Sequence, residues 1–354
     1  MSAIKSNTSE YRIWLRRKNE KDLIRRTKKR QAVRAERTRV IKHNTKIKAA
    51  ANYNAAEKRT EFEAPPNFSF VDNPNETIDF FRTIISFITN RLNSGKQIYI
   101  DISKIQNLSI DALMYLLAIL NNMNGKIKSK FSVSGNAPKD PTIRKLFNES
   151  GFYSFVRYTG AEPIVQNADT VQIVSGCESD NSLARHICDF VMTKAGLSRA
   201  QCRFIYVMMV EMMANVYKHA YNCNDVLYSR WYCFVKYLKE EGTVAFTFMD
   251  TGEGIPSTVR RNFAEKLDLL KIKSEYKYVE SALNGDFRTS THEEHRGKGL
   301  PKIRKFCTNE KIQNMRIITS KADVSVLSKS YRSKDLEKPL IGTLFSWKIN
   351  LAKC

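Results

Sequence analysis

Three polar residues recur every four positions inside a largely apolar stretch of the chain: Glu211, Asn215 and His219. On an α-helix, a step of four residues rotates the side chain by only about 40°, so all three would project from nearly one face. A carboxylate and an amide in apolar surroundings are costly unless a polar group meets them, and a metal ion with a phosphate chain would meet them. The stretch therefore predicts a helix that offers polar side chains to a ligand.

Three further motifs follow in order downstream of that helix. They are Asp250, Gly252 and Gly254, then Gly297, Lys298 and Gly299, and finally Thr343. Together with Glu211 and Asn215, these motifs resemble the four nucleotide-binding boxes of the GHKL ATPase superfamily. Four boxes in this order are far more specific than any one of them alone. The resemblance covers about residues 170–350 and implies a domain over 170–354 with the Bergerat fold, a two-layer α/β sandwich that binds ATP with Mg²⁺.

The resemblance also implies a role for each polar residue. Glu211 would position or deprotonate the nucleophile, and Asn215 would be a ligand of Mg²⁺, which keeps several waters and takes further ligands from phosphate oxygens. Asp250 ends a predicted strand over 243–249. It would accept a hydrogen bond from the exocyclic amine of adenine and so discriminate adenine from guanine. Thr343 would support the same pocket through its hydroxyl.

Gly297, Lys298 and Gly299 come directly before a predicted helix over 301–307. Pro301 suits the first turn of a helix, and N–H groups at a helix N-terminus bind phosphate well. This segment is therefore a candidate phosphate cradle, to which Lys298 adds positive charge. Each motif alone also has an ordinary interpretation: a turn after a strand, a helix cap, or a histidine satisfied at the end of a helix.

The preceding segment, over residues 67–158, predicts a smaller α/β domain because strands and helices alternate along it. The expected strands cover 68–71, 97–102 and 130–134, and the expected helices cover 77–92, 109–123 and 141–150. This segment resembles a STAS domain, the fold of anti-anti-sigma factors. The residue that matches the family's phosphoserine is Asp111, which would carry a permanent charge, and Ser109 is a displaced candidate. Alternatively, Ser109 caps a helix and Asp111 lies in its first turn.

The C-terminal segment predicts an α+β domain in which helices cover one face of a mixed, mostly antiparallel sheet. The resemblance to the GHKL superfamily implies that about 40 residues between 255 and 297 form a lid over the nucleotide. The expected strands cover 171–174, 229–238, 243–249, 316–320 and 343–349, and the expected helices cover 181–194, 198–221 and 301–307. The second of these helices opens with a capping box, Ser198 to Gln201.

Residues 1–62 predict a basic arm, helical or disordered, that ends before Pro65 and Pro66. The first 60 residues hold 19 Lys and Arg against 5 Asp and Glu, whereas the whole chain has a net charge of +23. Closely spaced cations release counterions from nucleic-acid phosphates, so nucleic acid is one expected partner of residues 1–60. An anionic membrane surface and a simply solvated arm remain open alternatives.

Several classes of protein do not match this composition. Seven cysteines are scattered and never spaced C-x-x-C, which predicts reduced thiols and a cytoplasmic location, with no zinc site. No apolar run approaches the roughly 20 residues that span a bilayer, and the basic N-terminus lacks the apolar core of a secretory signal. There is no Walker A motif, and His43 lacks the acidic neighbour expected of a histidine-kinase phosphoacceptor.

These features together predict an ATP-dependent regulatory switch with a protein partner. The sequence leaves open whether ATP is hydrolysed slowly or passed to a Ser or Thr of that partner. The alternative is a non-catalytic scaffold that holds its nucleotide permanently and is recruited to nucleic acid through the arm.

Overall fold

The computed structural model describes residues 52–54, 59–90, 93, 95–122, 131–156, 167–219, 230–269, 273–287, 299–308 and 312–350. Contacts divide the chain into two units, Met1–Ala50 and Ala51–Cys354, and every described element lies in the second unit. The predicted arm therefore falls almost entirely outside the described residues. The end of the predicted arm overlaps the strand Arg59–Glu63, which pairs with Gln97–Asp101.

The first part of the described chain is an α/β module built on a four-stranded sheet of order β1-β2-β4-β6. β1 is antiparallel to β2, whereas β2, β4 and β6 are parallel neighbours, and β3 pairs with β5 in a separate ladder. The elements are β1 (Asn52–Asn54), β2 (Arg59–Glu63), β3 (Asn67–Phe68), α2 (Pro74–Thr89), β4 (Gln97–Asp101), β5 (Asn107–Leu108), α3 (Ile110–Asn122), β6 (Ser132–Gly135), α5 (Pro141–Glu149) and the 3-10 turn η2 (Phe152–Ser154).

Helix α3 is apolar all the way round. Every residue from Ala112 to Ile119 is at most 2% exposed. A helix with no polar face must be covered on all sides. The four-stranded sheet can cover only one side of α3, so a second layer has to cover the other.

That second layer is a five-stranded sheet of order β10-β11-β9-β8-β7, in which every described pair of strands is antiparallel. The prediction of a mixed sheet is therefore wrong in this detail. The elements of this second module are β7 (Thr170–Gly176), α6 (Asn181–Ala195), α7 (Arg199–His219), β8 (Trp231–Leu238), η3 (Lys239–Glu241), β9 (Thr243–Asp250), α8 (Ile255–Leu269), α9 (Glu275–Asn284), α10 (Gly299–Cys307), β10 (Ile312–Val326) and β11 (Tyr331–Asn350).

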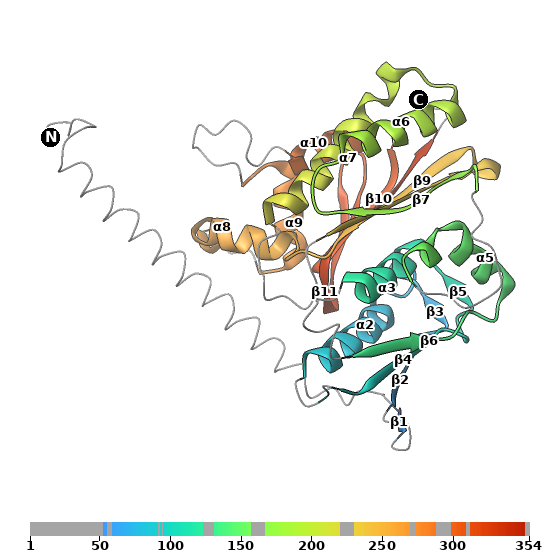
Figure 1. The fold of residues 1–354 in the computed structure, drawn as a ribbon. Helices are drawn as coiled ribbons and strands as arrows, with labels where there is room; N and C mark the ends of the chain where they lie inside the picture. The colour runs from blue at the N-terminus through green and yellow to red at the C-terminus, as the bar shows by residue number, and fades with distance from the viewer. Residues whose placement is uncertain are drawn as a thin grey trace, which may run out of the picture. The chain divides into compact units, whose positions relative to one another are not determined.

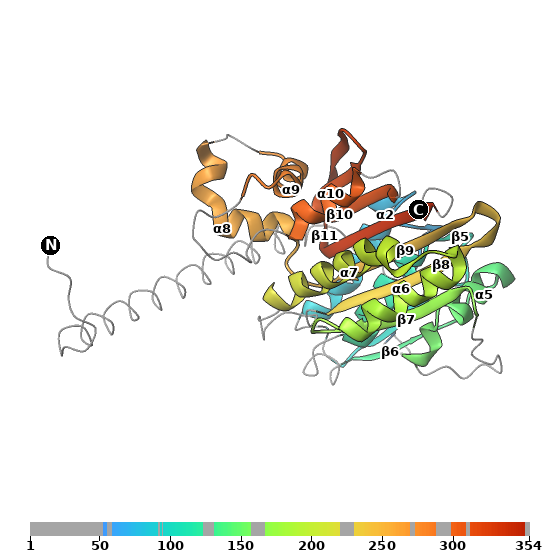
Figure 2. The same cartoon turned by 90° about the horizontal axis from the view of Figure 1, so that it is seen from above.

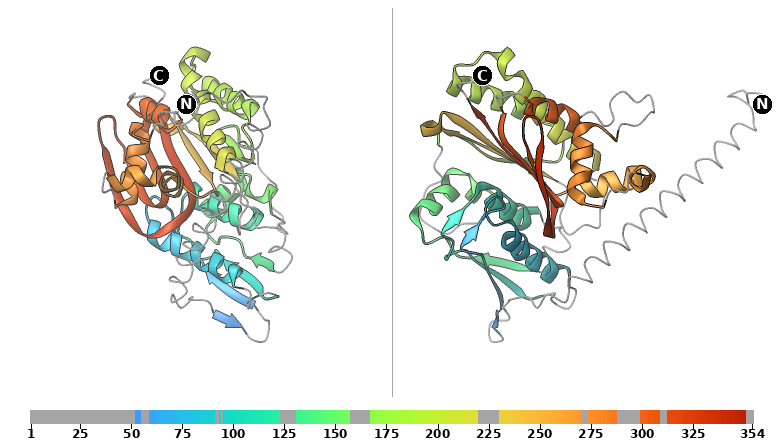
Figure 3. Two further views of the ribbon diagram at one scale, coloured as in Figure 1. Left: turned by 90° about the vertical axis from the view of Figure 1, so that its left-hand side faces the viewer. Right: turned by 180° about the vertical axis from the view of Figure 1, so that it is seen from behind.

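Strand β8 shows why the sheet is covered on both faces. Successive side chains of a strand point to opposite faces. Trp231, Cys233 and Val235 belong to a core shared with α6 and α7, whereas Tyr232 and Phe234 belong to a core shared with α2 and α3. The views agree: α6 and α7 lie on one face of the sheet, and α2 and α3 lie on the other, between the two sheets (Figures 1, 2 and 3).

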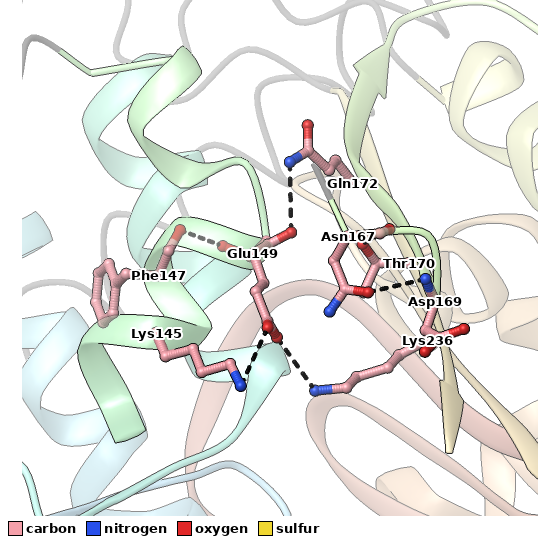
Figure 4. A network of polar contacts seen from close by, with 9 residues as sticks. Lys145, Phe147, Glu149, Asn167, Asp169, Thr170, Gln172 and Lys236 are labelled. Carbon is pink, nitrogen blue, oxygen red and sulfur yellow. Dashed lines mark hydrogen bonds and ion pairs between the residues drawn. The ribbon is translucent and has the colours of Figure 1, made fainter. Parts of the chain in front are cut away.

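A polar network joins the two modules at the edge strand β7 (Figure 4). The carboxylate of Glu149, on α5, lies 3.7 Å from Lys145 of the same helix and 3.7 Å from Lys236 of β8. Beside it, the N–H of Ile173 on β7 donates to the carbonyl of Ser150 at 2.8 Å. An edge strand with free N–H groups invites pairing with other chains, so this contact also protects the edge.

The helix that carries the first motif begins as the sequence predicts. The N–H of Ser198 donates to Oε1 of Gln201 at 3.0 Å, and the N–H of Gln201 donates to Oγ of Ser198 at 3.4 Å. This reciprocal pair is the predicted capping box, and α7 follows it to His219.

Two predictions about individual segments need correction, and a third segment, over residues 255–297, contains helices on which the sequence analysis made no prediction. The strand predicted over 68–71 is reduced to β3, and the chain then turns into α2. The lid segment contains two helices, α8 and α9, with a kink at Phe263. Strands β10 and β11 form one long hairpin that extends well beyond the two short strands expected there.

Asp111 lies in the first turn of a helix, as the ordinary interpretation of the sequence expects. Its side chain is buried, accepts hydrogen bonds from the Phe70 N–H and the Ser109 hydroxyl, and lies in the first turn of α3. Burial raises the pKa of this carboxyl, although both donors act in the opposite direction. Asp111 is therefore a structural group that ties α3 to the turn before α2.

Among the described residues, no helix combines the length and the apolar character needed to cross a bilayer. The five described cysteines are free thiols, and all but Cys177 are buried, as the sequence predicted for most of them.

Candidate functional site

Four segments that lie far apart in the sequence meet around one pocket between α7, the end of β9, α8 and β11. Its volume is about 110 Å³, below the roughly 300–1,000 Å³ of typical small-molecule sites, so the described residues enclose only part of a larger ligand. The pocket is lined by Met212, Asn215, Val216, Asp250, Gly252, Glu253, Gly254, Ile255, Thr258, Val259, Leu300, Thr343 and Phe345.

Asp250 is one of two described acidic residues that line the pocket. It ends β9, opposite Thr343 on β11. Its Oδ1 accepts a hydrogen bond from the N–H of Gly252 at 2.8 Å. Burial raises the pKa of the Asp250 carboxyl to about 6, and the opposing hydrogen bonds from Gly252 and Thr343 offset burial only in part. A carboxylate held in this way can accept one more hydrogen bond from a ligand.

Hydroxyl groups hold the backbone beside Asp250. The Thr319 hydroxyl donates to the carbonyl of Gly342 at 3.0 Å and lies 3.2 Å from the Thr343 hydroxyl. The same Thr319 oxygen accepts from the N–H of Ile255 at 3.0 Å. Thr319 therefore links β10, β11 and the first residue of α8 around the pocket.

Gly342 occupies a position that no other residue can adopt without strain. Its φ is +97°, and a Cβ there would lie 1.9 Å from the carbonyl oxygen of Asp250. Gly254, with φ +79°, is similarly close, because a Cβ there would lie 2.8 Å from Oγ1 of Thr319. The glycines thus bring β11 and the loop after β9 together at the pocket.

We expect Gly342→Ala to destabilise the protein by roughly 3 kcal/mol or more, because it adds backbone strain and a collision with Asp250. Gly196 is the matched control, since it also has a positive φ but has open space where a Cβ would lie. Gly196→Ala should therefore cost only about 1 kcal/mol, from backbone strain alone. Denaturant unfolding of both variants measures the difference, and equal losses would show that the close approach of Gly342 to Asp250 is unimportant.

Asn215 lines the pocket and Glu211 lies beside it, and both side chains are close to the start of α10. A Cβ built on Gly299, the first residue of α10, would lie 3.0 Å from Oε2 of Glu211 and 3.4 Å from Oδ1 of Asn215. The Glu211 carboxylate forms an ion pair with Lys302 in the first turn of α10, and the lysine side chain is 47% exposed. Two acceptor groups and a helix N-terminus therefore share one small region.

This region suits a metal ion only if a ligand supplies most of the coordination. Within the described ranges, no three His, Cys, Asp or Glu side chains come together as a metal cluster. The amide oxygen of Asn215 is an oxygen donor of the kind that Mg²⁺ takes, and Mg²⁺ commonly uses one or two protein groups with phosphate oxygens and water. The donor set thus fits Mg²⁺ bound together with a phosphate chain.

The structure brings most of the predicted site residues to this pocket. Asn215, Asp250, Gly252, Gly254 and Thr343 line it. Glu211 and Gly299 meet beside it. Gly297 and Lys298 lie outside the described residues, as does the side chain of His219.

Two contributing residues were not predicted. Thr319 was expected only as part of a strand, and Lys302 only as part of a helix. Their contacts join residues 91 positions apart in the case of Lys302 and Glu211, and 64 positions apart in the case of Thr319 and Ile255. A local pattern carries no signal for such pairs.

A scan against protein-family models and a search of curated proteins both returned no match. The function must therefore be inferred from the site itself.

Proposed function

We propose that the protein is an ATP-binding regulatory switch of the GHKL superfamily. Residues 170–354 would form a Bergerat-type ATP-binding domain, and residues 67–158 a STAS-like domain. One observation carries the proposal: the described members of four motifs, from Glu211 to Thr343, gather around a single pocket although they are far apart in the sequence.

The architecture supports this choice. The second module places α6 and α7 on one face of an antiparallel sheet, with Asp250 at the end of a central strand. The first module alternates parallel strands with helices. Both arrangements agree with the two proposed domains. Because many proteins of different function share such arrangements, the pocket residues must carry the functional part of the proposal.

Each residue would act through the group that it presents to the pocket. Asp250 would accept a hydrogen bond from the amine of the base, and Thr343 holds the Asp250 carboxylate in place. Asn215 would hold the metal ion, and the N–H of Gly299 would bind phosphate at the start of α10. When bound, Mg·ATP supplies the transferable phosphoryl group and a metal charge that neutralises its oxygens. Glu211 would orient a water or a hydroxyl and take its proton on the carboxylate.

Two nucleophiles fit this arrangement. Water would make the protein a slow ATPase, and a Ser or Thr of a protein partner would make it a protein kinase. In either case we propose that nucleotide occupancy shifts α8 and α9 and so alters a partner-binding surface in the cytoplasm. Labelled ATP, incubated with the protein alone and with a cell lysate, would show where the γ-phosphate goes.

Titration with ATP and GTP in the presence of Mg²⁺ tests the proposal directly. A site built around the Asp250 acceptor should prefer ATP to GTP by about 10²-fold or more, because guanine presents a carbonyl where adenine presents an amine. Removal of Mg²⁺ should weaken the binding of ATP much more than the binding of adenosine. Equal affinity for the two nucleotides, or no binding of either, would refute the assignment.

Binding of adenosine should weaken about tenfold when the pH falls from about 7.5 to about 5. The pKa of Asp250 is raised to about 6, so the carboxylate that accepts the amine becomes protonated in this window. Adenosine avoids the titration of the ATP phosphates. Asp250→Asn does not titrate and should show a flat profile, so a variant that keeps the wild-type pH dependence would assign the effect to another group.

A second candidate function is a non-catalytic scaffold whose nucleotide is structural and whose residues 1–60 bind nucleic acid. The observation that favours it is the concentration of 19 Lys and Arg against 5 Asp and Glu in those residues. A structural nucleotide would co-purify with the protein and would neither exchange nor turn over. Exchange of labelled ATP therefore distinguishes the scaffold from the switch.

A further inference from the structure

One hydroxyl group of the first module reaches the backbone that forms the pocket of the second. Tyr115, on α3, is 2% exposed, and its hydroxyl donates to the carbonyl of Ile341 on β11 at 3.0 Å. Its ring packs against Phe81 and Phe70, with centroids 4.7 and 5.3 Å away. The ring therefore belongs to the shared core, and the hydroxyl alone extends to β11.

The accepting carbonyl lies in an irregular part of the sheet. The pairing of β10 with β11 steps from Thr319 opposite Thr343 to Ser320 opposite Leu340. This step leaves Ile341 and Gly342 as extra residues on β11, which is a β-bulge. Bulges interrupt the ladder of hydrogen bonds and redirect the side chains that follow, and they are frequent beside functional sites.

This bulge sets the position of the pocket residues next to it. Gly342 comes directly after Ile341 and lies against the carbonyl of Asp250. Thr343 comes next and faces Asp250 across the strands. A shift of the Ile341 carbonyl would therefore move the backbone of Gly342 and Thr343, which lies next to Asp250 in the part of the pocket proposed to bind the nucleobase.

A neighbouring tyrosine shows that the core does not need a hydroxyl for packing. Tyr232, on β8, belongs to the same core, yet its buried hydroxyl has no hydrogen-bond partner among the described residues. The hydroxyl of Tyr115, in contrast, satisfies a carbonyl that the interrupted ladder leaves available. Both tyrosines are buried in the same core, and only the hydroxyl of Tyr115 has a hydrogen bond among the described residues, so Tyr232 serves as the control.

We propose that Tyr115 is a positioning residue for the base end of the pocket, through which the first module sets nucleotide affinity and base selectivity in the second. The inference rests on the proposed ATP-binding function. It goes beyond that function because it makes the first module part of the recognition site. The nucleotide would touch no residue of α3, and the effect would act through Ile341, Gly342 and Thr343.

Tyr115→Phe, compared with Tyr232→Phe in the full-length protein, tests the proposal. Tyr115→Phe should lower the affinity for ATP about fivefold, as expected for the loss of one buried hydrogen bond. It should also lower the ratio of ATP to GTP affinity. Tyr232→Phe should leave both within about twofold of wild type, because no hydrogen bond is lost. The ratio of ATP to GTP affinity is informative because a general loss of stability would not change it, provided that both affinities are measured well below the melting temperature.

Amide hydrogen exchange gives a second readout that needs no nucleotide. In Tyr115→Phe, exchange should accelerate in segment 340–344 more than in the rest of the five-stranded sheet. An unchanged ATP to GTP ratio together with uniform exchange would overturn the proposal and leave Tyr115 as a packing residue. If the wild-type protein binds no ATP, the proposed function fails, and local exchange in 340–344 still decides whether Tyr115 positions the bulge.

Discussion

Glu211→Ala should retain Mg·ATP affinity within about threefold of wild type and lose phosphoryl transfer or hydrolysis by roughly 10²–10⁴-fold, as expected for removal of a general base. The carboxylate lies next to the start of α10 and the Asn215 amide, where the terminal phosphate would be held. Glu211 does not line the part of the pocket that would hold the nucleobase, so ATP binding should survive. Release of labelled phosphate, or its transfer to a partner, measures the loss.

The ion pair between Glu211 and Lys302 supplies a control for this experiment. Lys302→Ala breaks the same ion pair but keeps the carboxylate, and a partly exposed pair contributes only about 0–1 kcal/mol to stability. Turnover by Lys302→Ala should therefore stay well above that of Glu211→Ala. If the two variants lose turnover equally, the loss comes from breaking the ion pair between Glu211 and Lys302, and Glu211 is not the base.

Asp250→Asn should weaken ATP by roughly 10–100-fold, because a buried charged acceptor is replaced by an amide whose NH₂ would face the adenine amine. GTP should bind the variant better than it binds the wild type, since that NH₂ can donate to the guanine carbonyl. The preference for ATP should therefore disappear or reverse. The fluorescence or calorimetric titrations that measure wild-type affinities measure this change as well.

An exposed carboxylate on β11 serves as the comparison for Asp250. Glu337→Gln removes a negative charge outside the pocket and should leave both affinities unchanged. If Asp250→Asn keeps the full preference for ATP, another group reads the base, and the proposed placement of adenine is wrong.

The sequence predicted the parts of the site that depend on regular spacing. Glu211 and Asn215 are four residues apart on α7, and the structure places both near the pocket because that spacing puts them on one helix face. Asp250 and Thr343 lie opposite each other because β9 and β11 pair, and the sequence predicted a strand at each of these two places. Such residues are predictable because their neighbours in sequence determine where they point.

The remaining features depend on contacts between distant segments. The bulge at Ile341 and Gly342 exists only because β10 and β11 pair with a shifted register, and Tyr115 reaches it from 226 positions away. No window of sequence contains both partners. The burial of both faces of β8, in contrast, could have been predicted, because the run from Trp231 to Val235 is apolar at every position and both sides of such a strand must be covered.

The core shared by the two modules has a consequence for how the molecule unfolds. Apolar residues of α2 and α3 and of the inner face of the five-stranded sheet form one cluster, which includes Tyr115, Phe234, Met249 and Leu344. Removing the first module would expose that whole sheet face to water, and losing the sheet would leave α3 with one side uncovered. We therefore expect the two modules to unfold together as one cooperative unit, because neither keeps a fully covered surface without the other.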